Sequence, residues 1–178
     1  LEDWPTAKLG DEFIDALLAA LPGLQKHGCS FREEGGFVRR MKEEGGTWLG
    51  HVFEHVAIEL QNMAGDEVTF GKTRGNGELG QYDVVFQYES EEIGLAAAEL
   101  TLRCLHHLLP VELQPSATRS ESFVWEEARD DFIRFAQRRA LGPSTASLVR
   151  AAEERNIPWL RLNRYSSVHL GHACHGNR

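Results

Sequence analysis

Residues 47–65 read TWLGHVFEHVAIELQNMAG, and this stretch decides the fold around it. Thr47 is a suitable N-cap for a helix, and Gly65 is a suitable C-terminal stop. Between them the apolar residues recur at helical spacing and share one face: Leu49, Val52, Phe53, Val56, Leu60 and Met63. The pattern predicts an amphipathic helix over residues 47–64 that packs on other elements through this face.

The other face of this helix carries the pattern H-x-x-E-H, formed by His51, Glu54 and His55. Two histidines four residues apart on a helix can bind one zinc ion. A carboxylate directly before the second histidine can serve as general base toward water, an arrangement typical of inverted zincin peptidases. The alternative is that the paired histidines are polar packing at a contact between domains.

A hydrolytic zinc site needs a third protein ligand and an open position for water. The start of the next long predicted helix offers four glutamates: Glu89, Glu91, Glu92 and Glu99. Among these we favour Glu91, and the other three stay open as alternatives.

Two other groups of histidines are weaker metal candidates. One crowds four potential ligands into seven residues, without the separated ligand pairs of structural zinc sites: His169, His172, Cys174 and His175. The other is the adjacent pair His106 and His107, which point in different directions on a helix.

Composition excludes several classes of protein. The chain has 178 residues and 42% hydrophobic residues, enough for one core without disulfides. Its formal net charge of -8 does not favour binding to nucleic acid or anionic membranes. No apolar run approaches the roughly 20 residues that cross a bilayer. Three widely separated cysteines indicate thiols in a reducing compartment, so a cytoplasmic location is expected: Cys29, Cys104 and Cys174.

Periodicity predicts the remaining elements and an α+β fold, with amphipathic helices packed on one face of a small, mainly antiparallel sheet. Helices are expected over residues 11–21, 90–109, 125–141 and 143–156. Short strands are expected over residues 68–70, 82–88 and 158–162. The glycine-rich segments 26–46 and 71–80 are expected to form loops, the first around at most one strand, and residues 111–122 a linker. In the second loop, Lys72 and Arg74 are available to contact carboxylates.

Short runs over most of the chain resemble the cyanophycin synthetases. They include Leu21-Pro22-Gly23-Leu24, Gly35-Gly36-Phe37, Gly46-Thr47-Trp48, Glu54-His55-Val56-Ala57 and Phe70-Gly71. Later runs resemble the start of that family's ATP-grasp domain: Leu141-Gly142-Pro143-Ser144-Thr145, Ile157-Pro158 and Leu170-Gly171. The resemblance implies an N-terminal, polymer-binding domain over residues 1–140 and the start of an ATP-grasp domain, truncated, over residues 141–178. Gln87 departs from the pattern, which has an acidic residue at this position.

The resemblance also implies a function. Such ligases build cyanophycin, an aspartate backbone with arginine branches, using ATP and Mg²⁺ in domains that this chain does not contain. Their N-terminal domain holds the growing polymer, and in some members a zinc site cuts polymer into primers. Carried over, His51, His55 and Glu91 bind the metal and Glu54 is the catalytic base, with Glu91 chosen because it follows Tyr88 as in the family's strand-to-helix junction.

In this interpretation Lys72 and Arg74 contact the polymer, and the fragment itself binds no ATP. The partners are the polymer and the remaining ligase domains of the same chain, in a homotetramer when the enzyme is full length. The alternative function is a non-catalytic structural or oligomerisation module that positions the ATP-grasp domain.

Overall fold

The computed structural model describes residues 4–43, 45–78, 81–114, 122–163 and 165–171. The chain forms two compact units, Leu1–Ala136 and Gln137–Arg178, which we call the N-terminal and C-terminal units. Both combine helices with small antiparallel sheets, so the expected α+β class is confirmed.

The N-terminal unit is mainly helical. Its first elements are α1 (Thr6–Ala20), the 3₁₀ helices η1 (Pro22–Lys26) and η2 (Cys29–Phe31), and α2 (Gly36–Lys42). They are followed by α3 (Leu49–Ala64), β1 (Gly71–Gly75), β2 (Tyr82–Phe86), α4 (Glu91–Leu108) and η3 (Val111–Leu113). Helix α5 (Trp125–Arg139) packs Trp125, Phe132 and Ala136 into the same hydrophobic core.

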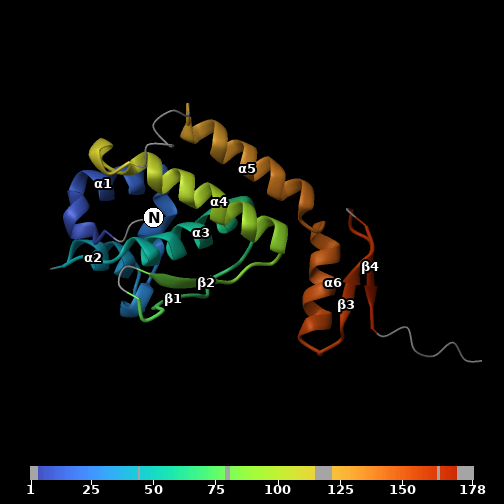
Figure 1. The fold of residues 1–178 in the computed structure, drawn as a ribbon. Coiled ribbons are helices and arrows are strands. Elements are labelled where there is room, and N and C mark those ends of the chain that lie inside the picture. The colour runs from blue at the N-terminus through green and yellow to red at the C-terminus, as the bar shows by residue number, and fades with distance from the viewer. Residues whose placement is uncertain (1–3, 44, 79–80, 115–121, 164, 172–178) are drawn as a thin grey trace, which may run out of the picture. The chain divides into compact units, whose positions relative to one another are not determined.

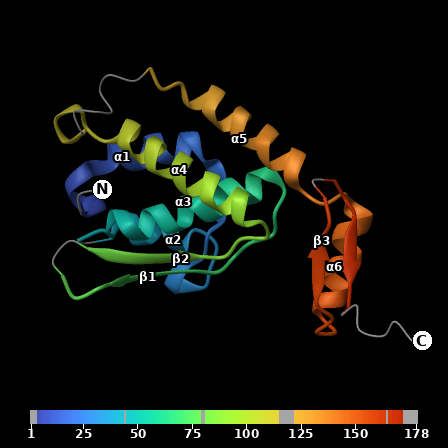
Figure 2. The same cartoon turned by 45° about the vertical axis from the view of Figure 1, so that its right-hand side comes forward.

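Helix α3 is the central element of this unit. It lies between α4 on one side and the β1–β2 hairpin on the other (Figure 1, Figure 2). Its predicted apolar stripe faces the core, where Leu49, Val52 and Leu60 are fully buried. Because the hairpin and the η1–η2 segment cover the opposite side, Glu54 and His55 are also buried instead of solvated.

The β1–β2 hairpin confirms an antiparallel sheet but corrects one predicted strand. Strand β1 is Gly71–Gly75, within the segment predicted as a loop, and it pairs Lys72 with Val85 of β2. The predicted strand 68–70 is irregular because side chains satisfy its backbone. The Asn62 side chain makes two 2.9 Å hydrogen bonds with the backbone of Val68, and Gln87 Oε1 accepts from the amides of residues 69 and 70.

The segment 26–46 contains the helices η2 and α2, whereas loops around at most one strand were predicted. Phe37 and Met41 lie four residues apart in α2, and both are buried. The start of α2 is tied down because Phe37 donates from its backbone N–H to the His27 carbonyl at 2.9 Å. Gly36 leaves no room for a Cβ beside the Gly28 carbonyl, so the backbone of this segment is closely packed.

The C-terminal unit consists of α6 (Pro143–Glu153), β3 (Trp159–Arg161) and β4 (Val168–Leu170). The two strands are antiparallel and pair Trp159 with Leu170. The predicted helix 143–156 and the predicted strand 158–162 are therefore present with shorter bounds, whereas β4 was not predicted. Of the predicted linker, Val111–Leu113 is helical and residues 115–121 lie outside the described residues, as do His172, Cys174 and His175.

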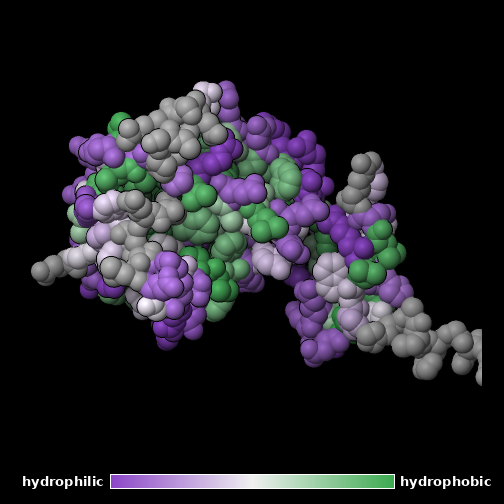
Figure 3. Space-filling view, viewed as in Figure 1, coloured by the Kyte–Doolittle hydropathy of each residue, from purple (hydrophilic) through white to green (hydrophobic). Residues whose placement is uncertain are grey.

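The surface of the N-terminal unit mixes polar and apolar residues. Hydrophobic side chains reach the surface over α4 and the hairpin (Figure 3), and Val85 and Leu95 are more than half exposed. None of the helices in the described part of the chain combines the length and the apolar character that a membrane span requires.

Candidate metal centre

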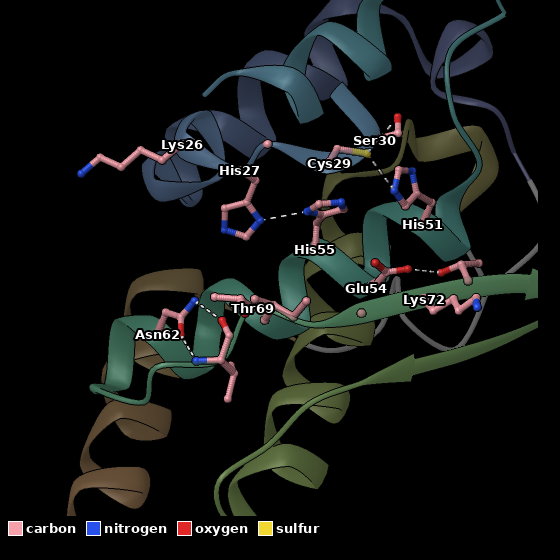
Figure 4. Close-up of a pocket in the computed structure, with 15 residues that line it drawn as sticks. Lys26, His27, Cys29, Ser30, His51, Glu54, His55, Asn62, Thr69 and Lys72 are labelled. Atoms are coloured by element: carbon pink, nitrogen blue, oxygen red, sulfur yellow. Dashed lines mark hydrogen bonds between the residues drawn. The ribbon is translucent and has the colours of Figure 1, made fainter. Parts of the chain in front are cut away.

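A cavity of about 590 Å³ opens in the N-terminal unit beside the middle of α3. Its walls come from α3, from the segment joining η1 and η2, and from β1 with the residues before it (Figure 4). This size is in the range of ligand-binding sites. Charged or metal-binding side chains of the lining are Lys26, His27, Cys29, His51, Glu54, His55 and Lys72.

Three side chains in this cavity converge closely enough to hold a metal ion. One ligand atom each from Cys29, His51 and His55 lies within 4.8 Å of the others. Cys29 Sγ is 3.3 Å from His51 Nε2, and a sulfur and a nitrogen bound tetrahedrally to zinc stand about 3.5 Å apart. The donor set and its spacing therefore fit zinc, and no other such group is found within the described residues.

The two histidines come from successive turns of α3, as predicted, but Cys29 comes from η2. Its backbone has φ 49°, in the left-handed region that non-glycine residues rarely adopt. The half-buried Cys29 side chain lies above the rings of His51 and His55 (Figure 4). The sequence does not reveal this candidate ligand, because no spacing rule links Cys29 to a motif 22 residues later.

Burial keeps both imidazoles neutral, the form that binds metal. The pKa of His55 is lowered to about 2 by desolvation, with further contributions from His51 and His27. Desolvation also lowers the pKa of His51, and the positive charge of Arg40 adds to this effect.

Glu54 lies in the same cavity and has a defined partner. Its Oε2 accepts a 2.6 Å hydrogen bond from the Thr73 hydroxyl of β1. Desolvation raises the pKa of Glu54, while the Thr73 hydrogen bond opposes that rise. Space for the carboxylate depends on Gly71, because a Cβ there would lie 2.5 Å from Glu54 Cγ. Such a buried carboxylate with a raised pKa suits a general base.

Comparison with known proteins places this chain in a family. A family model described as cyanophycin synthase-like N-terminal domain matches residues 1–110. The chain belongs to this family. The cyanophycin synthetase of Crocosphaera subtropica is 39% identical over 166 residues, which are 93% of this chain and 18% of that protein. Those of Geminocystis herdmanii and a Synechocystis species are each 38% identical over similar spans.

This cyanophycin synthase-like domain contains the whole cavity, since every lining residue lies between Lys26 and Thr73, inside the matched range. The chain spans less than a fifth of the length of these curated relatives, 18% in each case. The comparisons therefore show the family of this chain, and they do not assign to it the activity of the much longer relatives.

The remaining predicted site residues lie at different distances from this centre. Lys72 lines the cavity, whereas Arg74, two residues farther along β1, is exposed and is not part of the described lining. Glu91 is the exposed first residue of α4 and belongs neither to the lining nor to the three converging ligands. Glu89, an alternative to it, accepts from the Glu67 amide at 3.1 Å.

Proposed function

We propose that this chain cuts an arginine-branched polyaspartate into primers at a zinc site and holds the polymer during its synthesis. Cys29, His51 and His55 bind the metal, and Glu54 is the catalytic base. The observation that carries the proposal is the convergence of these three ligands within 4.8 Å in the cavity that Glu54 also lines. Cys29 takes the place that the sequence suggested for Glu91.

A zinc ion in this site would polarise an amide carbonyl and make water acidic enough to react near neutral pH. Glu54 accepts the proton from the attacking water and returns it to the leaving amine nitrogen. Thr73 holds Oε2 of this carboxylate and leaves Oε1 to accept the reacting proton. The hydrogen bond thereby fixes the base, and burial raises its pKa, which makes it a stronger proton acceptor.

The charge of the cavity indicates which part of the polymer enters it. Lys26 and Lys72 line it, and Glu54 is the only carboxylate among the described lining residues. Ammonium groups pair with the free carboxylate at the end of the aspartate backbone and with those of the arginine branches. The guanidinium groups then face the outside of a chain whose formal net charge is -8. Arg74 extends the carboxylate-binding side along β1.

The same proposal covers the longer protein. We assign residues 141–178 to the start of an ATP-grasp domain, and ATP and Mg²⁺ to the ligase domains beyond it. The full-length ligase is then a cytoplasmic homotetramer, and the present chain contributes polymer binding and primer formation but no ligation.

Elemental analysis of the purified, untagged chain tests the metal. We expect one zinc per chain, lost in the His51→Ala/His55→Ala variant. Incubation with purified cyanophycin, followed by mass spectrometry, tests the reaction. Glu54→Gln should keep zinc and lose cleavage. A chain without zinc, or a folded Glu54→Gln variant that still cuts polymer, contradicts the proposal.

The second candidate, a non-catalytic module that positions other domains, is favoured by a different observation. Val85 of β2 and Leu95 of α4 are 57% and 60% exposed, which suits contact with another domain. It predicts a chain that contains no zinc and cuts no polymer. In that case Val85→Lys and Leu95→Lys would weaken ligation by the full-length enzyme.

A further inference from the structure

Two consecutive hydrogen bonds connect the candidate metal centre with a buried carboxylate. Nδ1 of His55 lies 2.9 Å from Nδ1 of His27 (Figure 4). Nε2 of His27 lies 2.9 Å from Oε2 of Glu59. Glu59 belongs to α3, one turn after His55, and its side chain is buried beside His27.

The positions of the protons follow from the acceptor at the end of the chain. An ionised carboxylate can only accept, so His27 donates from Nε2 to Glu59. A neutral His27 then has a lone pair on Nδ1, and His55 must donate from its own Nδ1. Nε2 of His55 is left with a lone pair.

His51 shows the same pattern with a weaker constraint. Its Nδ1 lies 2.8 Å from the Thr47 hydroxyl, and its Nε2 faces Cys29 Sγ. A hydroxyl can donate or accept, so Thr47 permits either tautomer of His51. The Glu59 carboxylate, in contrast, permits only one tautomer of His27 and one of His55. The tautomer of His55 is therefore more strictly fixed than that of His51.

The Glu59 carboxylate occupies a space that depends on the absence of a side chain at Gly23. A Cβ on Gly23 of η1 would overlap Glu59 Oε1 and lie 2.5 Å from Cδ. The glycine therefore leaves the space that the carboxylate fills. Only the end of a flexible side chain would have to move, so alanine at this position displaces the carboxylate without disturbing the backbone.

We propose that Glu59 and His27 are positioning residues that hold His55 in the Nδ1–H tautomer and leave its Nε2 free to bind metal. The inference rests on the proposed function, because it assigns a metal to His55. Hydrogen-bond partners behind a histidine ligand typically change metal affinity about 10- to 100-fold when they are removed.

Two measurements on the purified chain test this inference. The first is zinc affinity, by competition with a chromophoric chelator, for the native chain, Glu59→Gln and Gly23→Ala. The second is the ¹⁵N spectrum of the histidine rings in the metal-free chain, which reports the tautomer without any metal. Glu12→Gln, an exposed position on α1, is the matched control.

We expect zinc affinity to fall roughly 10- to 100-fold in Glu59→Gln and in Gly23→Ala, and to be unchanged in the control. The metal-free spectra should show His55 protonated at Nδ1 in the native chain and a mixture in both variants. In Glu59→Gln an amide can also donate to His27, and in Gly23→Ala the displaced carboxylate no longer fixes the proton on His27 Nε2. Unchanged affinity with an unchanged His55 tautomer in both variants overturns the inference and leaves the zinc site standing.

A native chain that takes up no zinc overturns the proposed function, and the metal role of this hydrogen-bond chain with it. The spectra then decide the tautomer alone. Loss of the Nδ1–H signal of His55 in Glu59→Gln supports the positioning role, and its presence in both chains, or its absence from the native chain, overturns it.

Discussion

Cys29 Sγ lies 3.3 Å from Nε2 of His51, although 22 residues separate them in the sequence. The contact brings a thiol to the two histidines of α3, and the three side chains together could hold a metal ion. In the proposed site this thiol, a soft ligand that zinc binds well, takes the place of Glu91, which is exposed and lies outside the group.

The first prediction separates these two candidates for the third ligand. Cys29→Ser should reduce zinc affinity at least about tenfold, because a serine hydroxyl is a much poorer zinc ligand than a thiolate. Glu91→Gln should leave the affinity unchanged. Chelator competition measures both variants. The opposite result, a loss in Glu91→Gln alone, would restore Glu91 to the site.

Cys104 provides a matched thiol for that experiment. It is buried in the core, and burial raises its pKa to about 12. A thiol in this environment is unreactive. Cys104→Ala should therefore keep zinc, and a thiol reagent should modify Cys29 in the metal-free chain, with bound zinc protecting it.

The sequence predicted the part of the site that lies on one helix. His51, Glu54 and His55 need only helical periodicity to share a face, and the structure places all three in one cavity. Cys29 depends on the packing of η2 against α3 and on a left-handed backbone at φ 49°. Periodicity carries no information about either.

The β1 strand was missed for a related reason. Gly71, Lys72 and Gly75 have low β-propensity, and they are extended because they pair with the strand-forming residues of β2. In the segment 26–46, which contains α2, glycine pairs suggested loops, whereas the burial of Phe37 and Met41, four residues apart, stabilises a short helix. In both segments tertiary contacts outweighed local preference.

The second prediction concerns the space that Gly71 leaves for Glu54. Gly71→Ala should lower polymer cleavage by at least about tenfold and retain zinc, because it displaces the general base and no ligand. Gly75→Ala on the same strand is the control, since a Cβ there meets only the Gln81 carbonyl at 4.0 Å. Equal cleavage rates for the two variants would mean that Glu54 does not act from its present position.

The third prediction concerns the polymer. Lys72 lines the cavity and Arg74 does not, so Lys72→Ala should raise the KM for polymer cleavage more than Arg74→Ala. An exposed ion pair contributes at most about 1 kcal/mol, so the rise in KM for Lys72→Ala should be about fivefold or less. Steady-state cleavage at several salt concentrations measures it. A larger effect of Arg74→Ala would place the polymer along the outer end of β1.

The last prediction is a dependence of stability on pH that arises from Asp66, which is not one of the proposed metal ligands. Desolvation raises the pKa of Asp66 from 3.8 to about 6, with a further contribution from the negative charge of Glu89. One oxygen of Asp66, Oδ2, is buried without a hydrogen-bond partner in the described structure. The folded chain therefore holds the Asp66 proton more tightly than the unfolded chain does.

It follows that Asp66 stabilises the fold at low pH relative to high pH. Its contribution is fully present below pH 3.8, declines as the pH rises toward about 6, and is lost above that value. Asp66→Asn keeps the shape of the side chain and stays neutral, so it should raise the melting temperature at pH 7.5 and have no effect at pH 3.5.

Glu89→Gln retains an acceptor for the Glu67 amide but removes the charge, and should give a smaller increase at pH 7.5. Thermal melts across this range measure both, and an Asp66→Asn chain that is no more stable than the native chain at pH 7.5 would show that water solvates the ionised carboxylate.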